Sequence, residues 1–229
     1  MRLQRHLTEQ KVDIEQFWSL VQKKCQPFLK DWLPIQKRYG YIRPLYRGMD
    51  VGEWGEKRVR LDRKPESSTR EFHYDVDNLM KQKHGIYGRS QTVFVSGDDQ
   101  QAATYGETYI IFPVGKYRFL WSDKIRDLWV DVRRYDYVRD IKREVDKTMM
   151  LDATWNKLTD KKDIDKIRGE LEDMFYQRNQ EAIRRAVALY KKTDLKKAIE
   201  SETEIMIECQ SYLFLKSNWQ NDLEDLIVT

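Results

Sequence analysis

The chain has 229 residues and a mass of 27.7 kDa, a size that suits one large domain or two small ones. Apolar residues make up 40% of the sequence and aromatic residues 12%, with only five prolines, which excludes a disordered or collagen-like chain. Mean hydropathy is −0.80, and the longest apolar run, residues 109–112, is far shorter than the roughly 20 residues that cross a bilayer. These features predict a folded globular protein without a membrane span.

The start of the chain and its cysteine content bear on compartment and cofactor. The first ten residues contain no apolar segment of the kind found in a secretory signal, so a cytoplasmic protein is expected. Cys25 and Cys209 lie among apolar neighbours, and neither has a second thiol nearby in the sequence. With only three histidines present as well, the sequence predicts neither a disulfide framework nor a metal site.

The net charge of +4 is unevenly distributed along the chain. Residues 1–64 carry 15 basic and 8 acidic side chains, a net charge of +7, whereas residues 65–229 carry a net charge of −3. The basic part of the chain can meet an anionic partner, and solvated lysines on amphipathic helices would give the same pattern.

In chain order, the first predicted element is a helix. Apolar residues at spacings of three and four run from Val12 to Leu29, and Thr8 is a suitable N-cap. Residues 45–48 read as a short strand that leads into a glycine turn. Residues 50–70 are polar and rich in turn-forming residues, so a loop or lid is expected, and residues 71–83 resemble a helix.

Strand patterns dominate the middle of the sequence. Residues 92–96 predict a strand, and residues 100–105 predict a short helix that ends at Gly106. Residues 108–112 and 117–121 predict two strands joined as a hairpin by 113–116.

Helical and then strand character follows. Residues 138–200 are charged and mostly helical, and Asp194 is expected to cap the last short helix of this region. Residues 204–215 return to strand character, with an interruption near Gln210 and Ser211.

These patterns predict an α+β fold in a single domain over residues 1–229. Its parts would be an N-terminal helical region at 1–40, a split and mostly antiparallel β core at 41–137 and 201–216, and a long helical insertion at 138–200.

Three short motifs carry the functional information. The sequence contains no GxxxxGK[ST] loop, GxGxxG fingerprint, HExxH helix or GxSxG elbow, which removes several common enzyme classes. The motifs stand at predicted strand ends and are Leu45-Tyr46-Arg47-Gly48, then Val93-Phe94-Val95-Ser96-Gly97-Asp98 with Tyr105 shortly after it, and Glu202-Thr203-Glu204. In this order they resemble the ADP-ribosyltransferase superfamily, in its arginine-serine-glutamate branch.

The resemblance covers residues 45–121 and 200–215, and it implies the ADP-ribosyltransferase fold and the use of NAD as a substrate. Arg47, next to a flexible Gly48, would grip the pyrophosphate of NAD with its guanidinium. Glu204 would stabilise the oxocarbenium-like cation that forms when the nicotinamide–ribose bond breaks. Ser96 would hold Glu204 in register.

The resemblance implies two further roles. Glu202 would orient or deprotonate the acceptor. Tyr105 would either pack under the sheet or stack on nicotinamide. The family pattern differs here in one motif, which reads Ser96-Gly97-Asp98 instead of Ser-Thr-Ser. The long separation of Ser96 from Glu204 makes residues 138–200 an insertion.

Other segments, among them residues 84–90, are similar to uncharacterised bacteriophage-encoded proteins. This similarity implies a phage enzyme that modifies a host protein or nucleic acid in the host cytoplasm.

Two alternatives stay open at this point. Asp127 or Asp131 would supply the acid if the last strand lies elsewhere. In the other alternative, the chain is a non-catalytic module that binds nucleic acid or a host protein through a basic surface. That surface comprises Arg38, Arg43, Lys57, Arg58, Arg60, Arg63 and Lys64.

Overall fold

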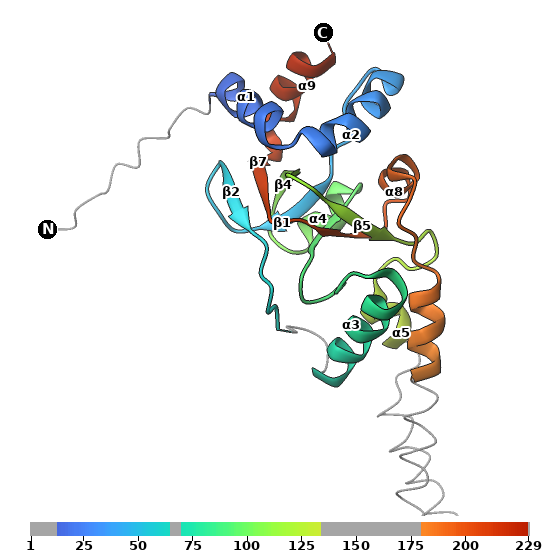
Figure 1. Cartoon of the computed structure of the whole chain (residues 1–229). Coiled ribbons are helices and arrows are strands. Elements are labelled where there is room, and N and C mark those ends of the chain that lie inside the picture. The colour runs from blue at the N-terminus through green and yellow to red at the C-terminus, as the bar shows by residue number, and fades with distance from the viewer. Residues whose placement is uncertain (1–12, 65–69, 134–179, 229) are drawn as a thin grey trace, which may run out of the picture.

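The computed structural model describes residues 13–64, 70–133 and 180–228, which form a seven-stranded sheet surrounded by helices (Figure 1). The strand order is β2-β7-β4-β1-β3-β6-β5, and every neighbouring pair is antiparallel. The α+β class and the antiparallel core predicted from the sequence are therefore confirmed.

The strands are β1 (Tyr46–Met49), β2 (Trp54–Arg58), β3 (Val93–Ser96), β4 (Glu107–Val114), β5 (Arg118–Trp121), β6 (Glu204–Glu208) and β7 (Ser211–Lys216). The helices are α1 (Ile14–Lys24), α2 (Gln26–Tyr39), α3 (Arg70–His84), α4 (Asp99–Ala103), α5 (Leu128–Arg133), α8 (Leu195–Glu200) and α9 (Gln220–Val228), with a 3-10 turn at Ser217–Trp219. Residues 180–188 are also helical.

The sheet divides between β1 and β3. β1 pairs with β4 over four residues, whereas its pairing with β3 consists of Tyr46 opposite Ser96. One half of the sheet is thus β2-β7-β4-β1, and the other is β3-β6-β5. The interruption leaves room at this junction for side chains from both halves.

Helices cover the sheet from two sides, with α1, α2 and α9 together on one side and α3 and α5 on the other (Figure 1). β6 shows the consequence for the sequence, because Ile205 and Ile207 belong to the larger buried cluster and Met206 to the smaller one. The middle of β6 is apolar at three successive positions because successive side chains point to opposite faces and both faces are covered.

Phe112 of β4 anchors the N-terminal helices. Its ring is fully buried and meets four other rings edge-on, at centroid distances of 5.6–6.2 Å. The four rings belong to Phe17, Trp18, Phe28 and Trp32. Such edge-on pairs add to the free energy gained from burial alone.

The N-terminal region differs from the prediction of one helix. The predicted cap Thr8 lies outside the described residues, and α1 begins after Asp13, whose side chain accepts a hydrogen bond from the Gln16 amide at 2.9 Å. The chain breaks at Cys25 and enters a second helix with Pro27 in its first turn, where a missing N–H costs nothing.

Two strand predictions are wrong. The expected loop at 50–70 contains β2, which pairs with β7 over five residues. The expected hairpin of residues 108–121 does not form, because β4 pairs with β1 and β7, and β5 pairs with β6. Instead of pairing with each other, β4 and β5 pair with the later strands β7 and β6, respectively.

For residues 194–216, the structure agrees with the sequence prediction. α8 is capped by Asp194, which accepts from the Lys197 amide, and the turn between β6 and β7 falls at residues 209–210. α9 was not predicted. Residues 138–179, which make up most of the expected insertion, lie outside the described residues.

Candidate functional site

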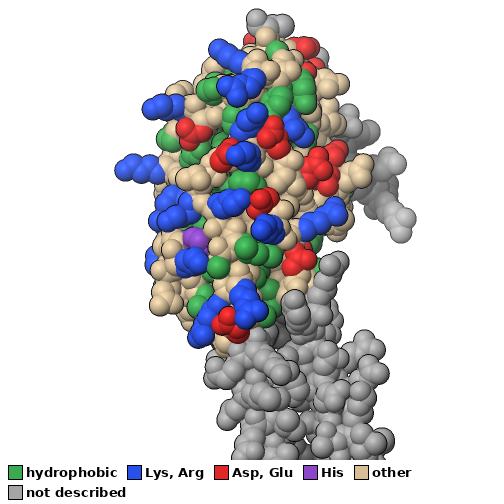
Figure 2. All heavy atoms as spheres, turned by 90° about the vertical axis from the view of Figure 1, so that its right-hand side faces the viewer, with side chains coloured by type: hydrophobic (Ala, Val, Ile, Leu, Met, Phe, Trp, Pro, Cys, Tyr) green, Lys and Arg blue, Asp and Glu red, His purple; other side chains and the backbone are tan. Residues whose placement is uncertain are grey.

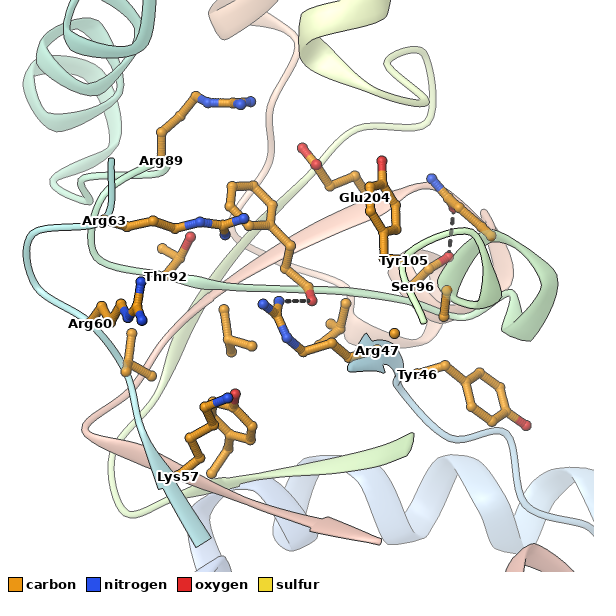
Figure 3. A pocket seen from close by; sticks show the side chains of 18 of the residues that line it. Tyr46, Arg47, Lys57, Arg60, Arg63, Arg89, Thr92, Ser96, Tyr105 and Glu204 are labelled. Atoms are coloured by element: carbon orange, nitrogen blue, oxygen red, sulfur yellow. Dashed lines mark hydrogen bonds between the residues drawn. The ribbon is translucent and has the colours of Figure 1, made fainter. Parts of the chain in front are cut away.

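A cavity of about 380 Å³ opens at the junction of the two halves of the sheet (Figure 3). Its walls come from β1, β2 and the segment that follows it, β3, α4 and the start of β6. Most of the residues predicted to bind NAD line it, namely Arg47, Gly48, Ser96, Tyr105 and Glu204. Glu202 does not line it.

Sheet register brings the three motifs together. β1, β3 and β6 are neighbours, and Ser96 lies opposite Tyr46 on one side and opposite Glu204 on the other. Residues directly opposite each other on antiparallel strands have Cβ atoms about 5 Å apart. Arg47 follows Tyr46 directly, so motifs that are far apart in the sequence meet at one place.

Glu204 is the first residue of β6, and its side chain is half-buried, with one carboxyl oxygen shielded from water. Its Oε1 is buried and has no hydrogen-bond partner within the described part of the chain. This burial raises the pKa of Glu204 to about 7; Arg89 and Arg63 act to lower the pKa, and Asp127 raises it. The carboxyl group can therefore change its charge near neutral pH.

Arg47 is held by the neighbouring strand. Its Nη1 donates a hydrogen bond to the Phe94 carbonyl oxygen at 2.7 Å, an interaction drawn in Figure 3. Its Nε is buried and has no partner among the described residues. The guanidinium also interacts with the Tyr212 hydroxyl, and the unpartnered Nε remains as a donor for an anion.

The Ser96 hydroxyl contacts both α4 and the turn before Glu204. It lies 2.8 Å from Gln101 Oε1 and 3.4 Å from the Glu202 carbonyl oxygen, and it accepts a hydrogen bond from the Asp98 amide at 3.0 Å. The predicted support of Glu204 by this hydroxyl is not seen, because the two residues are related through backbone pairing.

Tyr105 stands at the cavity with 69% of its surface exposed, so the prediction that it packs under the sheet is wrong. Its hydroxyl lies 3.5 Å from Asp127 Oδ2. A β-carbon on Gly48 would lie 2.1 Å from the Ala102 carbonyl oxygen and 2.9 Å from Tyr105 Cβ. Gly48 therefore permits a close approach of the α4 segment to β1, and this contact positions Tyr105.

Glu202 lies in the turn before β6, with a φ of 56° in the left-handed region. Its side chain is 59% exposed, with Oε1 3.8 Å from Nη2 of Arg43. The two glutamates of the Glu-x-Glu motif thus occupy different environments.

Asp127 and Asp131, the two alternative acids, differ in their position relative to the cavity. Asp127 lines the cavity and accepts a hydrogen bond from the Val130 amide at 3.0 Å, at the start of α5. Asp131 accepts from the amides of Arg126 and Asp127 and does not line the cavity. The last strands lie where the sequence predicted them, so the condition for this alternative is not met, and Asp127 lines the cavity together with Glu204.

The cavity wall is strongly basic. Besides Asp127 and Glu204, six basic residues line it, namely Arg47, Lys57, Arg58, Arg60, Arg63 and Arg89. Four of them belong to the basic surface proposed from the sequence, so that surface overlaps the cavity in part. Arg38, Arg43 and Lys64 do not line the cavity. A concave site of this charge attracts anions.

Arg89 and Phe94 are lining residues that sequence reasoning missed. The guanidinium groups of Arg63 and Arg89 lie 4.5 and 5.6 Å from the centroid of the Phe94 ring. The buried carboxylate of Asp77 accepts from the Arg89 amide at 2.6 Å and fixes the segment that carries it. No residue spacing in the sequence predicts that Arg89 lies against the Phe94 ring.

No family model, curated protein or solved structure matches the chain. Among residues 13–64, 70–133 and 180–228, no three or more His, Cys, Asp or Glu side chains are grouped so as to hold a metal ion. In the same ranges, no helix has the length and apolar character needed to cross a membrane.

Proposed function

We propose that this protein is an NAD-dependent ADP-ribosyltransferase, encoded by a bacteriophage, that modifies a host protein or nucleic acid in the host cytoplasm. The observation that carries the proposal is the meeting of Arg47, Ser96 and Glu204 in one basic cavity. The antiparallel sheet that divides between β1 and β3 supports assigning the fold to the ADP-ribosyltransferase type.

The residue types match what the reaction requires. When the bond between ribose C1′ and nicotinamide breaks, its electron pair leaves with nicotinamide and positive charge develops on the ribose. Ionised Glu204 stabilises that charge, and it does so strongly because one of its carboxyl oxygens is shielded from water. A nucleophile of the acceptor then bonds to C1′ and gives up its proton to water.

The other predicted residues fit around this step. The donors of Arg47 that the Phe94 carbonyl and the Tyr212 hydroxyl do not use bind the pyrophosphate. The exposed ring of Tyr105 offers a stacking surface for nicotinamide. The side chain of Glu202 lies outside the cavity, so its role toward the acceptor stays a prediction.

The test is transfer of labelled ADP-ribose from NAD to a bacterial lysate. Glu204→Gln keeps the shape of the site and removes the charge, so we expect transfer to fall by about a hundredfold or more. Glu208→Gln is the matched control, because Glu208 ends the same strand and pairs with Arg118 away from the cavity. Equal labelling by both variants, or the absence of NAD binding, would contradict the proposal.

A second candidate, a non-catalytic nucleic-acid module, is favoured by the basic side chains of Lys57, Arg58 and Arg60 in the wall. Such a module would bind an oligonucleotide with a log–log salt slope of about −0.9 for each duplex phosphate contacted. It would show no increase in melting temperature with NAD.

A further inference from the structure

We infer that the cavity is built for a dinucleotide that carries a further phosphate on its adenosine half, and that Lys57 and Arg60 bind this phosphate. The inference rests on the proposed function, because it takes the orientation of the dinucleotide from Glu204. It deepens that function by naming the class of donor.

The cavity has two chemically different ends. Figure 3 shows Glu204, Tyr105 and Ser96 on one side and Lys57 and Arg60 on the other. Arg47 lies between them (Figure 3). If the nicotinamide ribose lies at Glu204 and the pyrophosphate at Arg47, the adenosine half extends toward the basic end.

Within the described part of the chain, no ion pair neutralises the charge at that end. No described carboxylate lies within ion-pair distance of Lys57 or Arg60. Glu56, the neighbour of Lys57 on β2, instead pairs with Lys24 and accepts from the Ser211 hydroxyl. Elsewhere, as on the face shown in Figure 2, basic side chains lie among acidic ones.

Lys57 and Arg60 sit on adjoining parts of one wall. Lys57 pairs across the sheet with Tyr212, which also lines the cavity, so both side chains share its face of the sheet. Arg60 follows β2 within two residues and lines the same wall. Two cations at one end of a concave site form an anion-binding subsite.

The adenosine of NAD gives this subsite nothing to bind. Its ribose and adenine are uncharged, and the pyrophosphate is already met by Arg47. A 2′-phosphate on the adenosine ribose adds a multiply charged group, and basic side chains near that ribose are what accommodates such a phosphate in other dinucleotide sites.

The experiment compares dissociation constants for NAD and NADP by calorimetry, using the full chain and two double variants. The cavity variant is Lys57→Gln with Arg60→Gln. The control is Lys30→Gln with Lys37→Gln, which removes the same charge from α2, outside the cavity. Thermal unfolding of each protein establishes that it is folded.

We expect wild type and the control to bind NADP about tenfold more tightly than NAD, since charge-assisted hydrogen bonds contribute roughly 1.5–3 kcal/mol. The cavity variant should bind both dinucleotides alike, with its affinity for NAD within about threefold of wild type, because the Arg47 end is untouched.

Three outcomes would overturn the inference in different ways. Equal affinity of wild type for NAD and NADP would reject the phosphate subsite and leave the proposed function standing. Binding of neither dinucleotide would reject the proposed function as well. If a single-stranded oligonucleotide bound through Lys57 and Arg60 while the dinucleotides bound alike, the phosphate would belong to a nucleic acid, and the assignment to the donor would be wrong.

Discussion

At the scale of single residues, the half-buried side chain of Glu204 links stability to pH. Burial favours the neutral form of its carboxyl group. Between about pH 4.5, the ordinary pKa, and about pH 7, folding is therefore accompanied by proton uptake, and the free energy of unfolding falls as the pH rises. Below that window the group is neutral in both states. Above it the folded chain holds the carboxylate in its charged form, and the cost of burying that charge lowers the free energy of unfolding.

We therefore expect Glu204→Gln to be more stable than wild type at pH 8 and equally stable near pH 4.5, as measured by urea unfolding at both values. The advantage should grow as the pH rises through the window. Glu208→Gln should show no such trend. An advantage of Glu204→Gln that does not change with pH would contradict the assigned pKa.

The same ionisation predicts the pH profile of transfer. If only the charged form of Glu204 stabilises the ribosyl cation, kcat/KM should rise about tenfold per pH unit below pH 7 and level off above it. Initial rates of labelling between pH 5 and pH 9 measure this. A flat profile across pH 7 would show that Glu204 does not act as a charged group.

Glu202 supports a separate prediction from its backbone. A residue with a β-carbon at a φ of 56° is strained, and its ion pair with Arg43 is exposed, so that pair contributes little. Glu202→Gly should raise the free energy of unfolding by about 1 kcal/mol. Glu202→Gln keeps the strain and serves as the control. Destabilisation by glycine alone would show that the turn is not strained.

At the scale of elements, Gly48 governs how α4 and Tyr105 sit against β1. In Gly48→Ala the new methyl group would meet the Ala102 backbone, which cannot rotate away. We expect a loss of about 1–3 kcal/mol in urea unfolding, as for other overpacked sites, together with weaker binding of dinucleotide. Gly52→Ala is the control, because a β-carbon there meets nothing within 4 Å. Equal stability of the two variants would refute the close approach.

Several elements could be predicted from local pattern alone. β3, α4 and β6 have clear start and stop signals, and their order brought Arg47, Ser96 and Glu204 into one prediction. The β4–β5 hairpin failed because pairing of β4 with β7 is long-range and leaves no trace in the four residues between the two segments. β2 was missed since most of its residues are exposed, so it lacks an apolar alternation.

The surroundings of the site were harder to predict than its motif residues. The presence of Asp127 beside Glu204 depends on where α5 packs, and the exposure of Tyr105 depends on the contact of α4 with β1. Both are tertiary contacts between segments of unrelated pattern. Residue type and order predicted the motif, whereas packing decided which neighbours surround it.

At the scale of the whole molecule, the aromatic cluster around Phe112 joins the N-terminal helices to the sheet. Phe112→Ala removes the ring that the four neighbouring rings contact, so the free energy of unfolding should fall by about 3–5 kcal/mol. Leu226→Ala on α9, where the side chain is partly exposed, should cost less than about 1 kcal/mol. Comparable losses in both variants would mean that Phe112 is not central to the core.

The junction between β1 and β3 also determines what a bound ligand does to the motions of the chain. Arg47 belongs to one half of the sheet and Glu204 to the other, and the backbone pairing between these halves is Tyr46 with Ser96. A ligand held by both residues acts as a non-covalent cross-link, and opening of either half must release it. Its binding free energy is then added to the opening free energy of both halves, so amide hydrogen exchange in β1 and β6 should slow together as ligand is added.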